Sequence, residues 1–267
     1  MRDFAIKLAL DAGQVLREHF GGTLEVETKS SEIDPVTNAD RASEALILER
    51  LRRTFPQHAI LAEESGAHET SASEWRWVVD PLDGTVNFAH GLPHFCVSIA
   101  LYKGDRAHLG VIYDPMRDEL FWAERDKGAW MRDAGGSVRR LQVSNARRLR
   151  ESIVSTGFHY LRDRVRHNNI AEFEAVALRV QGVRRLGSAA LDLAYVAAGR
   201  LDGYWEYYLA PWDWAAGTLI VTEAGGAITT VEGDPWHLGV ESIAAANPHL
   251  LPLLLEALQS ARTRETE

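Results

Sequence analysis

The most informative segment of the chain reads Trp77-Val78-Val79-Asp80-Pro81-Leu82-Asp83-Gly84-Thr85-Val86-Asn87-Phe88. Its apolar run predicts a short buried strand, which Pro81 should end because proline has no N–H to donate. Asp80 is therefore expected at the strand end. If the Pro-Leu segment is a tight turn, Asp80, Asp83 and the Leu82 carbonyl can direct hard oxygens to one point, as Mg²⁺ requires. The alternative is a simple turn, since Asp, Pro and Gly are common turn residues.

The end of the same segment offers a place for an anion. Gly84 lets the backbone come close to a ligand, and the amides of Gly84 and Thr85 can begin a short helix that holds an oxyanion. Metal and phosphate can thus meet on one loop.

A second acidic signal lies far downstream, in Pro211-Trp212-Asp213-Trp214-Ala215-Ala216-Gly217. It places Asp213 at the start of a predicted helix that ends near residues 225–226. An aspartate there is most often only a cap. The two segments together favour a metal site more strongly than either does alone.

These residues carry a family resemblance. The run from Asp80 to Thr85 with Asn87-Phe88, followed by Trp212-Asp213 and Ala215-Ala216-Gly217, resembles both signature blocks of the inositol monophosphatase family. The likeness covers nearly the whole chain and includes Lys29-Ser30-Ser31, residues 34–40, Glu63-Glu64-Ser65, Gly187-Ser188-Ala189-Ala190 and Ala245-Ala246-Asn247. The chain departs from the family at Ala62, where glycine is frequent, and at Asp133-Ala134-Gly135-Gly136, where Asn-Gly is frequent. Neither departure removes a metal ligand.

The resemblance implies an α+β protein with the layered αβαβα sugar-phosphatase fold. It also implies a phosphomonoesterase that uses two or more Mg²⁺ ions and a metal-activated water. Glu63, Asp80 and the Leu82 carbonyl would hold one ion, and Asp80, Asp83 and Asp213 would hold the second. Without the resemblance, the pair Glu63-Glu64 would be taken as solvated loop acids.

The resemblance also assigns catalytic and substrate roles. Thr85, oriented by Asp40, would help Glu63 position the attacking water. The substrate would contact a set of residues formed by Gly84, Thr85, Gly187, Ala189, Glu206 and Asp213. From the sequence alone, Asp40 forms a capping box with Thr37, and Glu206 is by default a solvated charge at a strand end.

The implied substrate is inositol monophosphate or a similar polyol or sugar phosphate, and inhibition by Li⁺ is expected. Phosphatases acting on histidinol phosphate, fructose 1,6-bisphosphate or nucleotide 3′-phosphates remain alternatives, as does a non-catalytic regulatory member. We expect a homodimer.

Composition limits the classes of partner. The chain has 267 residues, 46% of them hydrophobic, which suffices for a large core. It carries 29 basic and 38 acidic residues, and the net charge of −9 disfavours nonspecific nucleic-acid binding. A phosphate ester therefore needs local positive charge, which bound cations would supply. The apolar runs are too short to span a membrane, and we expect a cytoplasmic protein.

Periodicity predicts an antiparallel sheet in the first half and alternating strands and helices in the second. Strands are expected at residues 23–28, 60–61, 95–101, 109–113, 119–123, 128–131, 153–157, 183–186, 203–205 and 227–230. Helices are expected at residues 4–20, 37–55, 169–181, 188–198, 213–224 and 248–262. We place one domain at residues 1–143 and a second at 144–267, because the arginine-rich residues 139–150 show little periodicity and are interpreted as a solvated face.

Three further features are assigned structural roles. Cys96 is the only cysteine and is interpreted as a small buried side chain. Ser188 lacks the surroundings of a nucleophile elbow and is interpreted as a helix cap. The ten histidines form no recognisable ligand set, and His90 and His94 are assigned to packing or surface.

Overall fold

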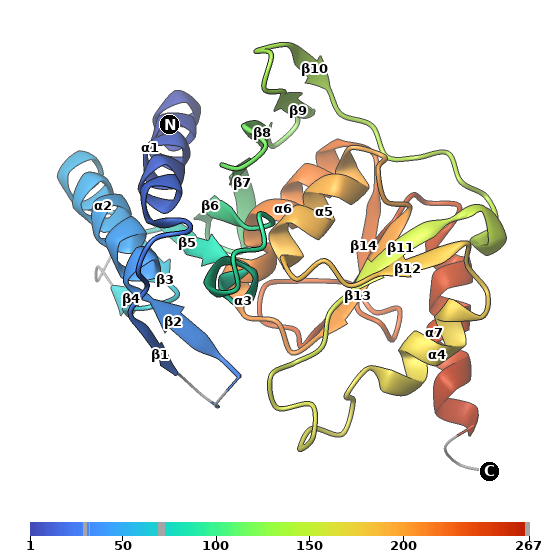
Figure 1. Cartoon of the computed structure of the whole chain (residues 1–267). Coiled ribbons are helices and arrows are strands. Elements are labelled where there is room, and N and C mark those ends of the chain that lie inside the picture. The colour runs from blue at the N-terminus through green and yellow to red at the C-terminus, as the bar shows by residue number, and fades with distance from the viewer. Residues whose placement is uncertain (29–30, 32, 69–72, 265–267) are drawn as a thin grey trace.

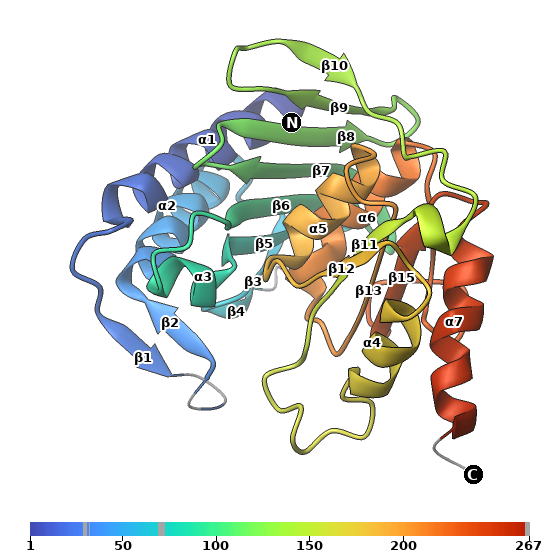
Figure 2. The same cartoon turned by 45° about the vertical axis from the view of Figure 1, so that its right-hand side comes forward.

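The computed structural model describes residues 1–28, 31, 33–68 and 73–264, without the side chains of 262–264. Helices and sheets alternate in layers (Figures 1 and 2). Helices α1 (Arg2–His19) and α2 (Asn38–Thr54) cover the outer face of a large sheet, and α5 (Ala189–Ala197) and α6 (Pro211–Glu223) cover its other face. A smaller sheet follows, and α4 (Ile170–Ala177) and α7 (Leu251–Arg264) lie on its far side. The expected αβαβα arrangement is confirmed.

The large sheet has the order β10-β9-β8-β7-β6-β5-β3-β4. All its pairs are antiparallel except β3 with β5, which confirms the antiparallel sheet predicted for the first half. Its strands are β3 (Ala59–Ala62), β4 (Gly66–His68), β5 (Trp75–Asp83), β6 (Cys96–Lys103), β7 (Arg106–Asp114), β8 (Glu119–Glu124), β9 (Ala129–Arg132) and β10 (Val138–Arg140).

The smaller sheet has the order β12-β11-β13-β15-β14. Strand β11 is parallel to both of its neighbours, whereas β15 is antiparallel to both of its own. The strands are β11 (Ile153–Thr156), β12 (Gly182–Arg184), β13 (Gly203–Tyr207), β14 (Ala227–Thr229) and β15 (Ser242–Ala246). A separate ribbon joins β1 (Val26–Thr28) to β2 (Pro35–Thr37). The short helices are α3 (Thr85–Ala89) and the 3₁₀ turn η1 (Leu149–Glu151).

Strand β5 corrects the expected effect of Pro81. The strand continues through the proline to Asp83, so Asp80 is not at its end. Asp80 pairs with Ser98 and Asp83 with Cys96, and the register shifts between these pairs. A bulge of this kind accommodates proline because the bulged residues make no regular ladder bond. Asp80 and Asp83 are thereby presented from a distorted strand and not from a tight turn.

Other differences concern weakly patterned segments. Strands β2, β4, β10 and β15 were not predicted; β15 is rich in alanine, which has low strand propensity, and tertiary burial overrides that preference. The predicted strand at residues 23–28 is limited to β1, and the helix predicted at 169–181 ends at Ala177.

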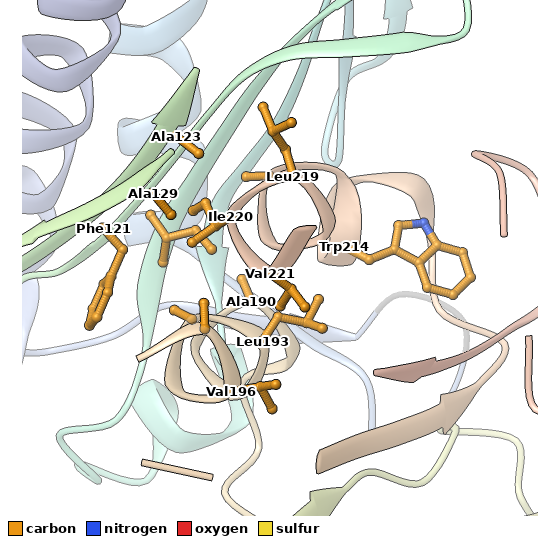
Figure 3. Close-up of a cluster of buried hydrophobic side chains, with 14 of the residues drawn as sticks. Phe121, Ala123, Ala129, Ala190, Leu193, Val196, Trp214, Leu219, Ile220 and Val221 are labelled. Atoms are coloured by element: carbon orange, nitrogen blue, oxygen red, sulfur yellow. The ribbon is translucent and has the colours of Figure 1, made fainter. Parts of the chain in front are cut away.

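The main core lies where α5 and α6 pack between the two sheets (Figure 3). Small residues on α6 permit this close packing. A Cβ on Gly217 would come within 2.6 Å of the Leu193 side chain, and a Cβ on Gly110 would come within 2.6 Å of the Ala216 carbonyl oxygen. The Ala215-Ala216-Gly217 run is therefore needed for the layer contact, in addition to any role in a site.

Residues of both predicted domains contribute to this core. Phe121 and Ala123 come from the first half, and Leu193, Trp214 and Ile220 come from the second. The boundary between residues 143 and 144 stays a prediction. Among the described helices, none is at once long enough and apolar enough to cross a membrane.

Candidate active site

A cavity of about 370 Å³ opens where β5, α3, β11, α5, β13 and α6 approach one another. It brings together every residue predicted for the site except Asp40. The predicted residues along its wall are Glu63, Asp80, Leu82, Asp83, Gly84, Thr85, Gly187, Ala189, Glu206 and Asp213. The fold therefore joins positions from both halves of the chain in one hollow.

Three carboxylates converge at one end of this cavity. Asp80, Asp83 and Asp213 each offer an oxygen, and these oxygens all lie within 4.8 Å of one another. Asp80 and Asp83 are buried, whereas Asp213 is half-buried. Burial raises the pKa of Asp80 well above its usual range, and the charges of Glu63, Asp83 and Asp213 raise it further. Clustered carboxylate oxygens, whose negative charges repel one another, suit the binding of a divalent cation.

Each aspartate is held by one of its oxygens. Asp83 Oδ2 accepts hydrogen bonds from Ser188 Oγ and from the Ala190 amide, both at 2.7 Å. Asp213 Oδ2 accepts from the Ala210 amide at 2.7 Å, which satisfies an amide at the beginning of α6. Asp213 therefore accepts a hydrogen bond at the beginning of α6 and also lines the cavity.

Asp80 and Glu63 form the neighbouring part of the cluster. Asp80 Oδ1 accepts from the Leu82 amide at 2.9 Å, within the bulge. Glu63 lies in the turn between β3 and β4, as the loop prediction required, and its charge contributes to the raised pKa of Asp80.

Thr85 and Asp40 form a buried pair behind this cluster. Thr85 Oγ1 lies 3.0 Å from Asp40 Oδ1 and 3.1 Å from the Leu82 carbonyl oxygen. Asp40 Oδ2 accepts from the amide and the hydroxyl of Thr37, at 2.8 and 2.6 Å. The capping box is confirmed, and the same carboxylate also contacts the site threonine.

Gly84 precedes α3 in a left-handed conformation. Its φ is 101°, and a Cβ there would lie 3.0 Å from the His94 carbonyl oxygen. Such a backbone favours glycine. The predicted short helix does begin at Thr85.

Glu206 differs from the default expectation of a solvated charge. It is only 8% exposed, on β13, and Tyr204 Oη donates to its Oε2 at 2.5 Å. Burial raises the pKa of Glu206 to about 7, although the hydrogen bond from Tyr204 and the charge of Arg185 oppose that rise. Gly157 makes room for this carboxylate, since a Cβ there would lie 2.1 Å from its Oε1.

Gly187 also needs to be glycine. Its φ is 88°, and a Cβ would come within 2.4 Å of Arg185 Nη1. Asn87 fixes the adjoining backbone, because its Nδ2 donates to the Leu186 carbonyl at 2.8 Å. Ser188 caps α5 as predicted, and Cys96 is buried as predicted.

Several polar residues of the cavity wall were not predicted for the site from the sequence. They are Asp34, Thr156, His159, Tyr160, Arg185, Asp192, Tyr207 and Tyr208. None belongs to a spacing pattern that predicts chemistry. The contact between Tyr204 and Glu206 could have been found from the sequence, because residues two positions apart in a strand lie on the same face of the sheet.

Comparison with known proteins identifies the family of the chain. A model of the inositol monophosphatase family matches residues 1–263. Inositol-1-monophosphatase of Synechocystis sp. is 44% identical over 256 residues, covering 96% of this chain and 88% of that protein. Nus factor SuhB of Pasteurella multocida is 43% identical over 266 residues, covering 99% of this chain and 98% of that protein.

Solved structures show the same relationship. The crystal structure of extragenic suppressor protein suhB from Bartonella henselae is 42% identical, covers 96% of this chain and 97% of that chain, and gives a TM-score of 0.89. The structure of inositol monophosphatase from Anabaena is 44% identical, covers 97% of this chain and 94% of that chain, and gives a TM-score of 0.85. The chain therefore belongs to the inositol monophosphatase family and is a phosphoric monoester hydrolase of that type.

Proposed function

We propose that the protein hydrolyses inositol monophosphate, or a similar polyol or sugar phosphate, with Mg²⁺. The observation that carries this proposal is the shape of one cavity, with Asp80, Asp83 and Asp213 converging at one place and Glu206 buried in the same wall. The carboxylate cluster suits the phosphate end through bound cations, and Glu206 suits an alcohol rich in hydroxyls.

The residues that would hold Mg²⁺ are those in the cluster. Glu63, Asp80 and the Leu82 carbonyl would form one position, and Asp80, Asp83 and Asp213 would form the second. When bound, Mg²⁺ supplies positive charge for the phosphate and acidifies a water molecule. The chain's overall charge of −9 makes this local positive charge necessary for an anionic substrate.

The chain itself would orient the attacking water. A threonine hydroxyl has a single proton, and the Thr85 Oγ1 atom lies 3.0 Å from Asp40 Oδ1. If the proton is donated to Asp40, the Thr85 oxygen remains available to accept from water. Glu63, on the same cavity wall, would accept the second proton of that water as a general base.

The substrate would be positioned by backbone and side-chain groups together. The amides of Gly84 and Thr85 would bind phosphate oxygens at the beginning of α3. Gly187 and Ala189 would line the path of the alcohol, and the Glu206 carboxylate would accept hydrogen bonds from its hydroxyls.

The direct test is a panel of phosphate esters offered to the purified protein with Mg²⁺. We expect myo-inositol 1-phosphate to be hydrolysed better than an aryl phosphate, and we expect inhibition by Li⁺ at raised concentration. A preference for histidinol phosphate, fructose 1,6-bisphosphate or a nucleotide 3′-phosphate would replace the proposed substrate. If Li⁺ does not inhibit, only the expected inhibition is contradicted, and the proposed substrate and metal stand.

A second candidate is a regulatory role, with or without turnover. Relatives about as similar as the phosphatases carry the name Nus factor SuhB, at 42–43% identity. From the net charge we expected no nucleic-acid partner. The name of these relatives leaves a regulatory partner, including a nucleic acid, open for our chain. The retained carboxylates favour the phosphatase. We also propose a homodimer in the cytoplasm, which sedimentation and cell fractionation would test.

A further inference from the structure

A second hollow lies away from the active site. It has a volume of about 380 Å³ and is lined by η1, the segment after α4 and one side of α7. The lining residues are Arg147, Arg148, Leu149, Arg150, Arg179, Leu253 and Glu256. Four arginines thus face one glutamate, on a protein whose net charge is −9. We call this hollow the arginine groove.

Most of these arginines have no counter-ion. Among the described residues, the side chains of Arg147, Arg150 and Arg179 make no hydrogen bond and no ion pair. Arg148 approaches Glu151 at 3.3 Å, but both side chains are largely exposed, at 78% and 58%. Some arginines elsewhere are paired, as Arg200 is with Glu119. The groove differs from other exposed arginines because four of its arginines line one hollow. The four arginines outnumber the single glutamate, so the lining of the hollow has an excess of positive charge, which attracts anions.

The chemistry of the lining indicates the class of ligand. Arginine presents a planar fork of donors that matches phosphate oxygens, and several forks around one hollow suit adjacent phosphates. Leu149 and Leu253 add an apolar part to the wall. A volume of about 380 Å³ lies in the range of small-molecule sites, roughly 300–1,000 Å³. We propose that the arginine groove binds a polyphosphate chain, either free or carried by a nucleotide.

The compactness of the groove favours a small ligand over a nucleic-acid strand. A strand is bound by cations spread along many successive phosphates. Here seven residues surround a single hollow. The arginines of residues 139–150 are therefore only in part the solvated face expected from the sequence, because Arg147, Arg148 and Arg150 converge with Arg179 from another segment.

The groove is distinct from the active site. The two hollows share no lining residue. Strand β11 connects them, since it follows η1 directly and ends at Thr156 in the wall of the active cavity. From Ile153 to Thr156 an extended strand spans roughly 10 Å. Because the two hollows share no lining residue, the proposal of binding in the groove does not rest on the proposed phosphatase function.

The test measures binding of inorganic tripolyphosphate and of ATP to the full chain, by calorimetry with Mg²⁺ in excess. The variant Arg147→Gln/Arg179→Gln should weaken both at least about tenfold, and raised salt should weaken wild-type binding. The matched control is Arg53→Gln/Arg106→Gln, which removes equal charge from exposed arginines outside the groove. Hydrogen exchange should show protection of residues 147–151 and 178–182 in the presence of either probe.

A further variant distinguishes a free polyphosphate chain from one carried by a nucleotide. If the nucleoside contacts the apolar wall, Leu149→Ala should weaken the binding of ATP but not of tripolyphosphate. If only the phosphate chain is bound, the substitution should leave the binding of both probes unchanged. Equal binding by the double variant and wild type, or protection confined to the active cavity, would overturn the proposal. So would arginine-dependent binding of an RNA oligonucleotide that tripolyphosphate does not displace. Hydrolysis of inositol phosphate should be unchanged in the double variant, so failure here leaves the phosphatase proposal separately testable.

Discussion

The two sides of the active cavity are built in different ways. At the metal side, Asp80, Asp83 and Thr85 come from one short run of sequence, and only Glu63 and Asp213 arrive from elsewhere. At the alcohol side, Glu206 of β13, Gly187 before α5 and Gly157 after β11 come from three separate segments of the second half of the chain. With the proposed roles, most of the reaction chemistry would reside in a local motif, whereas substrate selection would depend on how the second sheet is placed.

The largest expected effect is a fall in kcat when a proposed metal ligand is substituted. Asp83→Asn and Asp213→Asn should each lower kcat by roughly 10³-fold on every substrate, because a ligand charge is lost at nearly constant volume. A chelator should abolish turnover. The measurement is kcat on inositol and aryl phosphates, with thermal melting to confirm folding.

The control for these variants is Asp105→Asn, at an exposed turn between β6 and β7. It should behave as wild type. Full turnover in metal-free buffer would contradict the mechanism, and a near-normal rate in one variant would remove that aspartate from the metal site.

A smaller fall in kcat is expected at Thr85, which lies beside the proposed metal ligands and would orient the attacking water. Thr85→Val should lower kcat by about 10²-fold with little change in KM, because general acid-base groups contribute roughly that much. Thr85→Ser keeps the hydroxyl near Asp40 and should restore much of the rate. A change confined to KM would place Thr85 in substrate binding instead.

At the alcohol side the effect should be selective. Glu206→Gln should reduce the preference for inositol phosphate over aryl phosphate by about tenfold, while the aryl rate is spared. Tyr204→Phe is the matched control, since it removes the donor to Glu206 but keeps the carboxylate. Equal losses on both substrates would show that Glu206 supports the whole site.

Apart from the effects on turnover, we expect the stability of the protein to depend on pH through Glu206. Burial raises the pKa of Glu206 from 4.5 to about 7, so the folded protein keeps a proton that the unfolded chain releases. Between about pH 5 and pH 7, wild type should therefore lose stability relative to Glu206→Gln, by up to ~1.4 kcal/mol per pH unit. Urea unfolding of both metal-free proteins across this range measures it. A constant difference would show that Glu206 titrates normally.

Some of these features follow from local chemistry and were predictable. Gly84 with Thr85 indicated a helix start, and Thr37 with Asp40 indicated a capping box, because caps and turns depend on residues a few positions apart. Both are present in the structure. The carboxylates of Asp80 and Asp83, which we propose as metal ligands, were equally visible as residue types at a fixed spacing.

Other features depend on contacts between distant segments, which no local pattern reports. The sequence by itself determined which side chains offer oxygens and where most helices begin and end. Only the tertiary structure brought Asp213 within 4.8 Å of Asp83, buried Glu206 beside Tyr204, and carried β5 through Pro81 by pairing it with β6. The physical reason is that burial, charge coupling and strand register arise from packing across layers, whereas propensity and capping act within a single turn of the chain.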